Sequence, residues 1–317
     1  MVMLDEVQGQ EDGVRHLRRV VAGQLVSPLL LVGEEGTGRR FATLQAIREM
    51  FCTGTRRPDC SCPDCIQVTA GAHPDLMIVE ATDKDIGIDS IRDALERAGS
   101  FPAVAPVRVF LIDGADRMTV PAANALLKTL EEPPRTTRFF LLTDNERRVI
   151  PTIRSRCGRV SFGRLPESFI LSVLSQHCED HGKALVYCRI AEGSLGRAVR
   201  YWGSGRLGLR DKVFSILTLG SKRDFASLFT AIDALGKEIP LSLRFLEQLL
   251  LDLAMIQYDP TRIINRDIAD KLSALRVNDA VRERLVAGLR DIRASHRTTH
   301  IVLPFHVKTL FATAFGV

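Results

Sequence analysis

The sequence has no apolar run of the roughly 20 residues that a membrane-spanning helix needs. Its apolar stretches, such as residues 139–143, have the length of buried strands. The N-terminal segment MVMLDEVQGQEDG is acidic and lacks the pattern of a secretion signal. Low-complexity segments and fixed-period repeats are also missing. We therefore expect a folded cytoplasmic protein with no membrane partner.

A strong net charge is also absent. The 43 Lys and Arg residues against 38 Asp and Glu residues leave +5 over 317 residues, and the basic residues are scattered rather than clustered. This balance permits contact with nucleic acid but does not demand it. With 45% apolar and 26% charged residues, the composition is that of an ordinary globular protein, and the length predicts two or three domains.

Strands and helices alternate in the first half of the chain. Strands are predicted at residues 27–32, 75–80, 107–113 and 138–143, and helices at residues 40–51, 89–98 and 120–131. This alternation favours a parallel sheet covered by helices. From about residue 165 only helices are predicted, at residues 168–177, 185–191, 209–219, 224–235, 241–258, 268–275 and 279–295, with a Gly-rich linker at residues 202–208. The expected fold class is therefore α/β followed by all-α.

The segment VGEEGTGRR, residues 32–40, follows the first predicted strand and nearly matches a phosphate-binding loop. Gly33, Gly36 and Gly38 are in place, but Arg39 and Arg40 replace the Lys and the Ser or Thr of the pattern. Arg39 keeps the positive charge on a bulkier group. Arg40 removes the hydroxyl that ligates Mg²⁺ and places a cation beside the expected metal position. Two unit charges 4 Å apart repel by about 4 kcal/mol at an effective dielectric constant of 20. The alternative is a glycine-rich turn that never bound phosphate.

A second nucleotide-site signal is the buried strand VFLID, which ends at Asp113. This is a Walker B arrangement, in which the Asp at the strand end helps to hold Mg²⁺. In active ATPases of this type the next residue is Glu, which orients the attacking water, and here it is Gly114. Alone, Asp113 is equally explained as a turn residue. Three altered catalytic positions together indicate a retained fold that has lost hydrolysis.

Four of the seven cysteines fall within fourteen residues, at Cys52, Cys60, Cys62 and Cys65. A cytosolic protein does not use such a group as a disulfide framework, and four thiolates form a complete tetrahedral set for zinc. Such a site is structural, because it leaves no open position for a reacting water. A redox pair or a fortuitous cluster is the alternative. Only one residue separates Cys60 from Cys62, so one of these two could turn away from the metal.

Three later segments carry a family resemblance: NALLKTLEEPP at residues 124–134, FLLT at 140–143 and PTIRSRC at 151–157. With VQGQ at residues 7–10 and GSLGR at 193–197, they resemble the AAA+ clamp-loader ATPases of bacterial DNA polymerase III. The resemblance covers residues 5–200, and the cysteine segment lies where bacterial clamp loaders carry zinc. The altered glycine loop resembles that of the subunit class that keeps the fold without hydrolysing ATP.

The resemblance implies roles for single residues. Arg156 matches the arginine of the family's SRC motif, an arginine finger that enters the ATP site of a neighbouring subunit. From the residues alone, Arg156 could instead form a salt bridge that holds a turn. Thr143 matches the sensor 1 position. Arg197 lies near the sensor 2 position but one place late, which speaks against a phosphate contact within its own subunit.

The expected architecture has three parts. Residues 1–163 are predicted to form a RecA-like AAA+ domain with the zinc module near residues 52–65, residues 164–206 a helical lid, and residues 207–317 a helical collar that oligomerises. The resemblance implies a non-catalytic stator that supplies Arg156 in trans during loading of a sliding clamp onto primed DNA. Its implied partners are the gamma/tau-type ATPase subunits and the delta subunit, with transient proximity to the clamp and to primer–template DNA.

Two other functions remain open at this stage. The first is an ATP-hydrolysing motor subunit of the same assembly, in which Arg39 still serves as the loop cation. The second is a zinc-containing nucleic-acid-binding protein, for which tight and salt-sensitive DNA binding is expected.

Overall fold

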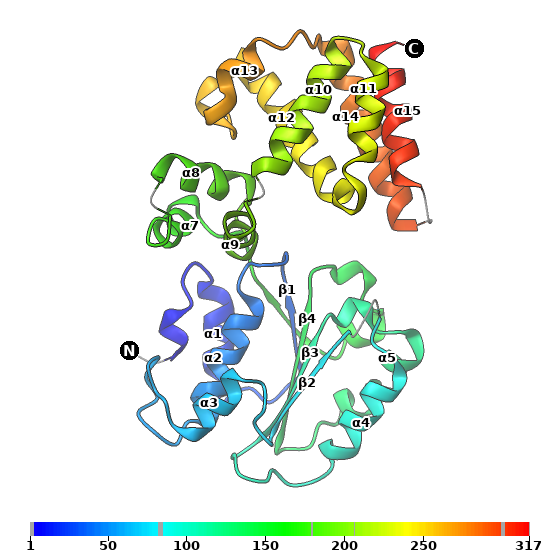
Figure 1. Ribbon diagram of the computed structural model, residues 1–317. Helices are drawn as coiled ribbons and strands as arrows, with labels where there is room; N and C mark the ends of the chain where they lie inside the picture. The colour runs from blue at the N-terminus through cyan, green and yellow to red at the C-terminus, as the bar shows by residue number, and fades with distance from the viewer. Residues whose placement is uncertain (1–2, 82–84, 179, 206, 299–301, 317) are drawn as a thin grey trace. The chain divides into compact units, whose positions relative to one another are not determined.

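The computed structural model describes residues 3–81, 85–178, 180–205, 207–298 and 302–316 (Figure 1). The chain divides into two compact units. The first comprises Met1–Ile170 together with Gly193–Arg197, and the second comprises Leu171–Glu192 and Ala198–Val317. This division joins much of the expected lid to the C-terminal helices. The boundaries at residues 163 and 206 stay a prediction about domains.

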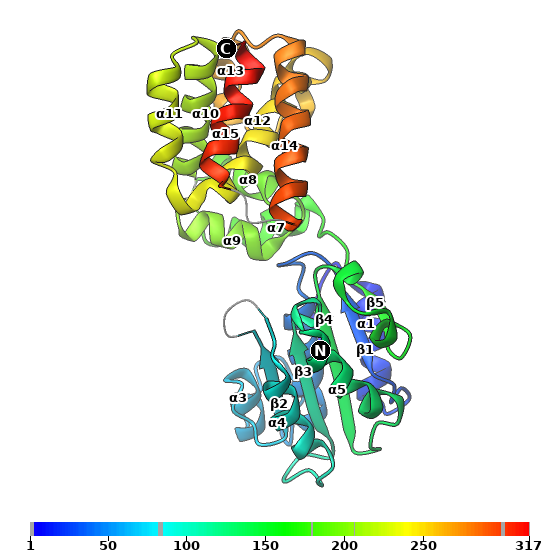
Figure 2. The ribbon, with the colours of Figure 1, turned by 90° about the vertical axis from the view of Figure 1, so that its right-hand side faces the viewer.

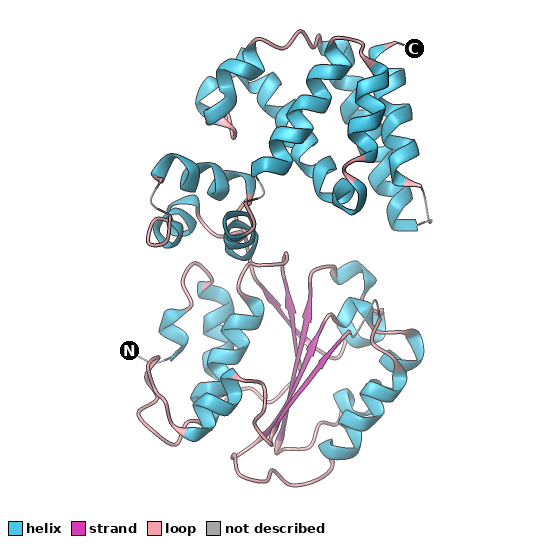
Figure 3. Ribbon diagram, in the orientation of Figure 1, coloured by secondary structure: helices cyan, strands magenta, loops and turns pink. Residues whose placement is uncertain are grey.

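The first unit is built on a five-stranded sheet in the order β2-β3-β4-β1-β5. The strands are magenta in Figure 3. The strands, all paired in parallel, are β1 (Leu29–Val32), β2 (Leu76–Glu80), β3 (Arg108–Asp113), β4 (Thr137–Thr143) and β5 (Gly158–Ser161). The first four strands confirm the predicted ones, with bounds that differ by two residues or fewer. Strand β5 was not predicted, because it has no apolar run. It pairs only with β1, and Val160 is its one buried residue.

Helices cover both faces of this sheet (Figure 1). The short 3₁₀ helix η1 (Met3–Glu6) and the helices α1 (Glu11–Val21), α2 (Arg39–Phe51) and α3 (Pro63–Thr69) lie on one face, with α4 (Ile88–Ala98) and α5 (Val120–Glu131) on the other. Strand residues alternate between the two cores: Leu29 and Leu31 join the first, and Leu30 joins the second. Burial on both faces explains why these strands read as continuous apolar runs. The short elements η2 (Ala115–Arg117), η3 (Glu146–Arg148) and α6 (Pro151–Arg154) complete the unit.

The second unit is entirely helical in its described residues (Figure 2). Its elements are the end of α7 (Glu167–Leu174), α8 (His181–Ile190), most of α9 (Leu195–Gly203), α10 (Leu207–Ser221), α11 (Phe225–Asp233), η4 (Gly236–Glu238), α12 (Ile239–Tyr258), η5 (Pro260–Arg262), η6 (Arg266–Ile268), α13 (Ala269–Ser273), α14 (Asp279–Thr298) and α15 (Leu303–Phe315). None of the described helices has the length and apolarity of a membrane span. The α/β class followed by an all-α region is thus confirmed.

The predicted linker at residues 202–208 was too long. Trp202 and Gly203 end α9, and Leu207 already begins α10. Polar contacts join the segment before α9 to α12 within this unit. Gln248 Nε2 donates to the carbonyl oxygen of Ile190 at 2.9 Å, and an Arg244 nitrogen lies 2.9 Å from a Glu192 carboxylate oxygen. These contacts explain why residues 171–192 group with the C-terminal helices.

Candidate functional site

A glycine-rich turn connects β1 to α2, in the strand–turn–helix order that a phosphate-binding loop requires. Gly36 and Gly38 have φ angles of +79° and +97°, in the left-handed region that favours glycine. Gly33 is needed for a different reason. A Cβ atom there would lie 2.4 Å from the carbonyl oxygen of Phe162, so the turn packs tightly against the segment that follows β5.

The segment Gly193–Arg197 lies against this turn within the first unit. Gly196 N–H donates to the carbonyl oxygen of Gly36 at 3.1 Å, and Arg197 Nη2 lies 3.0 Å from Glu34 Oε2. Arg164 also pairs with Glu34, at 2.8 Å. Burial alone would raise the pKa of Glu34, but the two arginines hold that pKa below its ordinary value. The arginine near the sensor 2 position is therefore paired with a loop carboxylate.

Arg40 lies between two strand-end carboxylates. Its Nη1 atom is 2.7 Å from Glu80 Oε2 and 2.8 Å from Asp113 Oδ2. The two acids lie together because Glu80 and Asp113 are register partners at the ends of β2 and β3. Burial alone would lower the pKa of Arg40, but the hydrogen bonds to Glu80 and Asp113 raise it above its ordinary value. The carboxylate of Asp113 is thus bound by a cation of the chain itself.

The residue after Asp113 has a backbone unsuited to glutamate. Gly114 has φ of +98°, and a Cβ atom added there would lie 2.5 Å from Arg117 Nε. A side chain at this position would strain the backbone and displace Arg117. The substitution Gly114→Glu alone would therefore place a glutamate here only if the backbone and Arg117 rearranged.

Arg39 and Thr143 meet at the ends of α2 and β4. The Arg39 guanidinium donates to the carbonyl oxygen of Thr143, and the Thr143 hydroxyl donates to Asp116 Oδ1 at 2.8 Å. They line a recess of about 460 Å³ that also includes Asp116 and Asp144. Burial, followed by the neighbouring Asp116, raises the pKa of Asp144. The Thr143 hydroxyl is thus engaged with an aspartate of its own chain.

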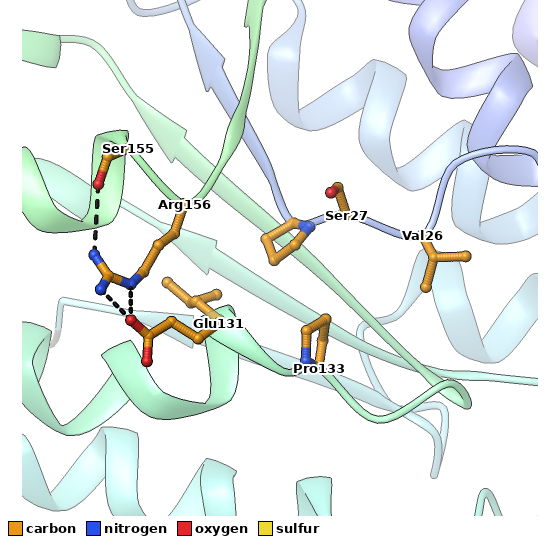
Figure 4. A pocket seen from close by; sticks show the side chains of 8 residues that line it. Val26, Ser27, Glu131, Pro133, Ser155 and Arg156 are labelled. Atoms are coloured by element: carbon orange, nitrogen blue, oxygen red, sulfur yellow. Dashed lines mark hydrogen bonds and ion pairs between the residues drawn. The ribbon is translucent and has the colours of Figure 1, made fainter.

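Arg156 lies elsewhere, in a recess of about 600 Å³ at the surface of the first unit (Figure 4). Val26 and Ser27, which precede β1, line the same recess, whereas the glycine turn follows β1. Arg156 is therefore at the end of β1 away from the glycine turn. Its Nε atom lies 2.8 Å from Glu131 Oε1, Nη2 contacts the same oxygen, and Nη1 donates to the carbonyl oxygen of Thr152 at 2.9 Å.

The four clustered cysteines converge on one point. The Sγ atoms of Cys52, Cys60, Cys62 and Cys65 all lie within 4.8 Å of one another, with Cys52–Cys60 at 3.6 Å and Cys52–Cys62 at 3.9 Å. Zinc–sulfur bonds of about 2.3 Å in a tetrahedron place sulfurs roughly 3.8 Å apart, so the set fits a zinc ion. A Cβ atom at Gly54 would lie only 2.8 Å from Cys60 Sγ. The sulfurs of Cys60 and Cys62 both belong to this group, although only one residue separates the two cysteines in the sequence.

Local structure explains this convergence. Cys52 caps the end of α2, Cys62 caps the start of α3, and Cys65 lies in its first turn. The N–H of Cys62 and the hydroxyl of Thr55 lower the pKa of Cys60 to about 6. Burial and the neighbouring sulfurs raise the pKa of Cys65. A bound Zn²⁺ would offset half of the negative charge of four thiolates and allow all four thiols to ionise together.

The structure adds residues that the sequence analysis did not single out. Glu80 was read only as a strand end and Glu34 only as part of the loop, yet both bind arginines of this site. The parallel order of β2 and β3 would have indicated Glu80, since strand ends meet at one edge of a sheet. Glu131 was predicted only as the end of the helix at residues 120–131, and no local pattern places it beside Arg156.

Comparisons with known proteins address the family of the chain. A family model described as "DNA polymerase III, delta subunit" matches residues 9–166. The DNA polymerase III subunit delta' of Escherichia coli K12 is 30% identical over 235 residues, which cover 73% of this chain and 70% of the relative. The gamma/tau subunit of Mycobacterium tuberculosis H37Rv is 32% identical over 181 residues, covering 56% of this chain and 31% of the relative.

Among solved structures, the fold resembles a DNA polymerase III gamma subunit-related protein from Thermotoga maritima, with a TM-score of 0.59 and 18% identity. This alignment covers 96% of this chain and 99% of the other, and at that identity it shows the fold alone. The family-model match and the extent of the match to the E. coli subunit confirm the family resemblance of the sequence. The chain belongs to the delta-prime family of DNA polymerase III clamp-loader subunits.

Proposed function

We propose that this clamp-loader subunit is a non-catalytic stator that does not hydrolyse ATP. The observation that carries the proposal is the pairing of Arg40 with Asp113 and Glu80. Where an active loop offers Mg²⁺ a hydroxyl, this chain offers a guanidinium, and the Walker B carboxylate is already neutralised. A metal ion near that guanidinium would be repelled by about 4 kcal/mol for each unit of charge at 4 Å.

The second part of the proposal is that Arg156 acts in trans, as an arginine finger for a neighbouring ATPase subunit. Its side chain is 30% exposed in a surface recess, away from this chain's own glycine turn. A guanidinium inserted beside the γ-phosphate offsets charge that develops there, and in related systems this is worth about 10³–10⁵ in rate. The proposed role thus needs a fixed scaffold and one available arginine.

The third part concerns zinc. Cys52, Cys60, Cys62 and Cys65 would hold a structural Zn²⁺ that ties the end of α2 to α3. With four protein ligands, the ion would supply folding stability and no reactive water.

The proposed partners follow from the assembly. The names of the relatives are subunits delta' and gamma/tau of DNA polymerase III, so ATPase subunits of the gamma/tau type are the proposed neighbours. The delta subunit, the sliding clamp and primer–template DNA complete the proposed setting. Residues 207–317 are proposed to form the oligomerising collar, and residues 164–206 the lid.

Two measurements test the stator. The purified chain should show no Mg²⁺-dependent ATP hydrolysis above background, and turnover that Asp113→Ala abolishes would favour the motor alternative. In a complex reconstituted with the partner subunits, Arg156→Ala should depress ATPase activity and clamp loading while the variant chain unfolds at the wild-type temperature. Arg154→Ala, two residues earlier, is the matched control. Unchanged turnover with Arg156→Ala would contradict the trans role.

A further inference from the structure

We propose that Glu131 is a positioning residue that holds Arg156 in a folded-back resting state. In this state Glu131 competes with the phosphate of the neighbouring subunit for the guanidinium. The inference rests on the proposed trans role of Arg156 and deepens it. It assigns the control of the finger to a carboxylate of the same chain.

The contacts of Arg156 are the first step of the argument. Nε and Nη2 both donate to Glu131 Oε1, and Nη1 lies 3.5 Å from Ser155 Oγ, to which it donates (Figure 4). Nη1 also donates to the carbonyl oxygen of Thr152. A guanidinium has five N–H donors, so four of them are engaged within the subunit. A finger in this state cannot present a free fork to a phosphate. It has to leave Glu131 first.

The position of Glu131 strengthens its hold on the arginine. Glu131 is the last residue of α5, where the partial negative charge of the helix end adds to that of the carboxylate. The same negative charge would repel an approaching phosphate. Glu131 therefore both attracts the finger and disfavours the ligand that the finger is proposed to meet.

The contact is nevertheless easy to reverse. The side chains of Arg156 and Glu131 are 30% and 48% exposed, and they border a recess rather than a packed core (Figure 4). Exposed ion pairs are weak, so a sizeable minority of molecules has the finger free at any time. The state in which Arg156 is free of Glu131 is only partly populated, so removal of the Glu131 carboxylate raises the population of that state. The expected gain is about two- to fivefold, the factor that corresponds to a pair of about 0.4–1 kcal/mol.

The test uses two readouts on the same variants. In the full-length chain alone, phenylglyoxal modification of Arg156, followed by peptide mass spectrometry, reports how free the guanidinium is. In the reconstituted clamp loader, the Arg156-dependent ATPase activity is the turnover above that of the complex with Arg156→Ala. Glu131→Gln keeps the shape and removes the charge, and Glu131→Ala is the second variant. Glu132→Gln, the adjacent exposed glutamate, is the matched control.

Both Glu131 variants should raise the modification rate and the Arg156-dependent ATPase activity about two- to fivefold, and Glu132→Gln should leave both at the wild-type level. If Arg156→Ala impairs the complex but neither Glu131 variant raises either readout, the resting contact is overturned while the trans role stands. If Arg156→Ala leaves turnover unchanged, the trans role fails and this inference fails with it. A purely structural Glu131 would lower stability without raising either rate.

Discussion

Among the described residues of the first unit, the strand-end carboxylates and the cysteine cluster are both of the kind that bind metal ions, and they differ in one respect. At the ends of β2 and β3, Glu80 and Asp113 surround the guanidinium of Arg40. In the cysteine cluster, the described hydrogen bonds to the sulfurs come from N–H groups, the hydroxyls of Thr53 and Thr55, and other thiols. The carboxylates therefore have a protein cation, whereas the proposed cation of the cysteine cluster is a metal ion from outside the chain.

The two proposals together describe a chain that keeps a metal-dependent scaffold and dispenses with a metal-dependent reaction. A fixed guanidinium satisfies carboxylates but brings no reactive water and no open coordination position. Four thiolates cannot be neutralised by the N–H groups around them. The carboxylate group should thus be indifferent to divalent ions, and the cysteine cluster should depend on them.

The largest expected effect comes from removing the ion from the cysteine cluster. Structural zinc sites contribute on the order of 10 kcal/mol in small zinc-binding peptides, and part of that should be lost here on chelation. Cys65→Ser should do the same, because Cys65 is 1% exposed and packs with Met3 and Cys52. Metal analysis should give one zinc per chain, and thermal unfolding with and without chelator should show the loss.

Cys178→Ser is the matched control for this experiment, since Cys178 is a free cysteine outside the cluster. It should retain zinc and the wild-type response to chelator. A wild-type chain that unfolds at the same temperature with and without chelator would remove the contrast between the two groups.

A second, smaller effect is expected at Arg40. Arg40→Thr leaves Asp113 and Glu80 without their cation and should lower stability by about 1–2 kcal/mol. For a chain of this length that corresponds to a few degrees of unfolding temperature. Millimolar Mg²⁺ should recover part of the loss in Arg40→Thr and should leave the wild type nearly unchanged. Differential scanning calorimetry with and without Mg²⁺ measures both.

Arg15→Thr serves as the control for Arg40→Thr, because Arg15 pairs with Asp12 in a contact whose side chains are 70% and 76% exposed. It should cost little stability and show no response to Mg²⁺. An equal response to Mg²⁺ in the wild type would mean that the guanidinium does not replace the ion.

The smallest effect separates the two carboxylates that bind Arg40. Glu80→Gln should cost under about 1 kcal/mol, because exposed ion pairs are weak and the Glu80 side chain is 56% exposed. Asp113→Asn should cost more, because the Asp113 side chain is only 25% exposed, so solvent screens its pair with Arg40 less. Urea titration of both variants, each compared with the wild type, measures the order. The reverse order would show that Glu80 is the main partner of Arg40.

Much of the fold was predictable because its signals are local. Strands β1 to β4 are buried on both faces, so each is a continuous apolar run in the sequence. The helices α1 and α3 were missed for local reasons too. Helix α1 carries only a narrow apolar face of Val14, Leu17 and Val20, and α3 is seven residues long and begins at a proline.

The site was predicted less completely, because its contacts join residues that are far apart in the chain. The sequence identified Arg40 and Asp113 as altered and retained parts of one nucleotide site, and the structure brings them to 2.8 Å. The sequence did not indicate that Arg40 binds both Glu80 and Asp113, since that contact depends on the register of β2 against β3. Likewise, the contact of Arg156 with Glu131 spans 25 positions and depends on how α5 ends.

The close packing around the glycine turn bears on how such sequences are interpreted. A methyl group at Gly33 would collide with the backbone of Phe162, and one at Gly36 would lie 2.3 Å from the Ser194 hydroxyl. Both glycines are thus required by their neighbours, whether or not a phosphate ever enters the turn. A nucleotide-binding signature can outlast its ligand in this way, so the spacing of glycines alone is poor evidence that a homologous subunit still binds ATP.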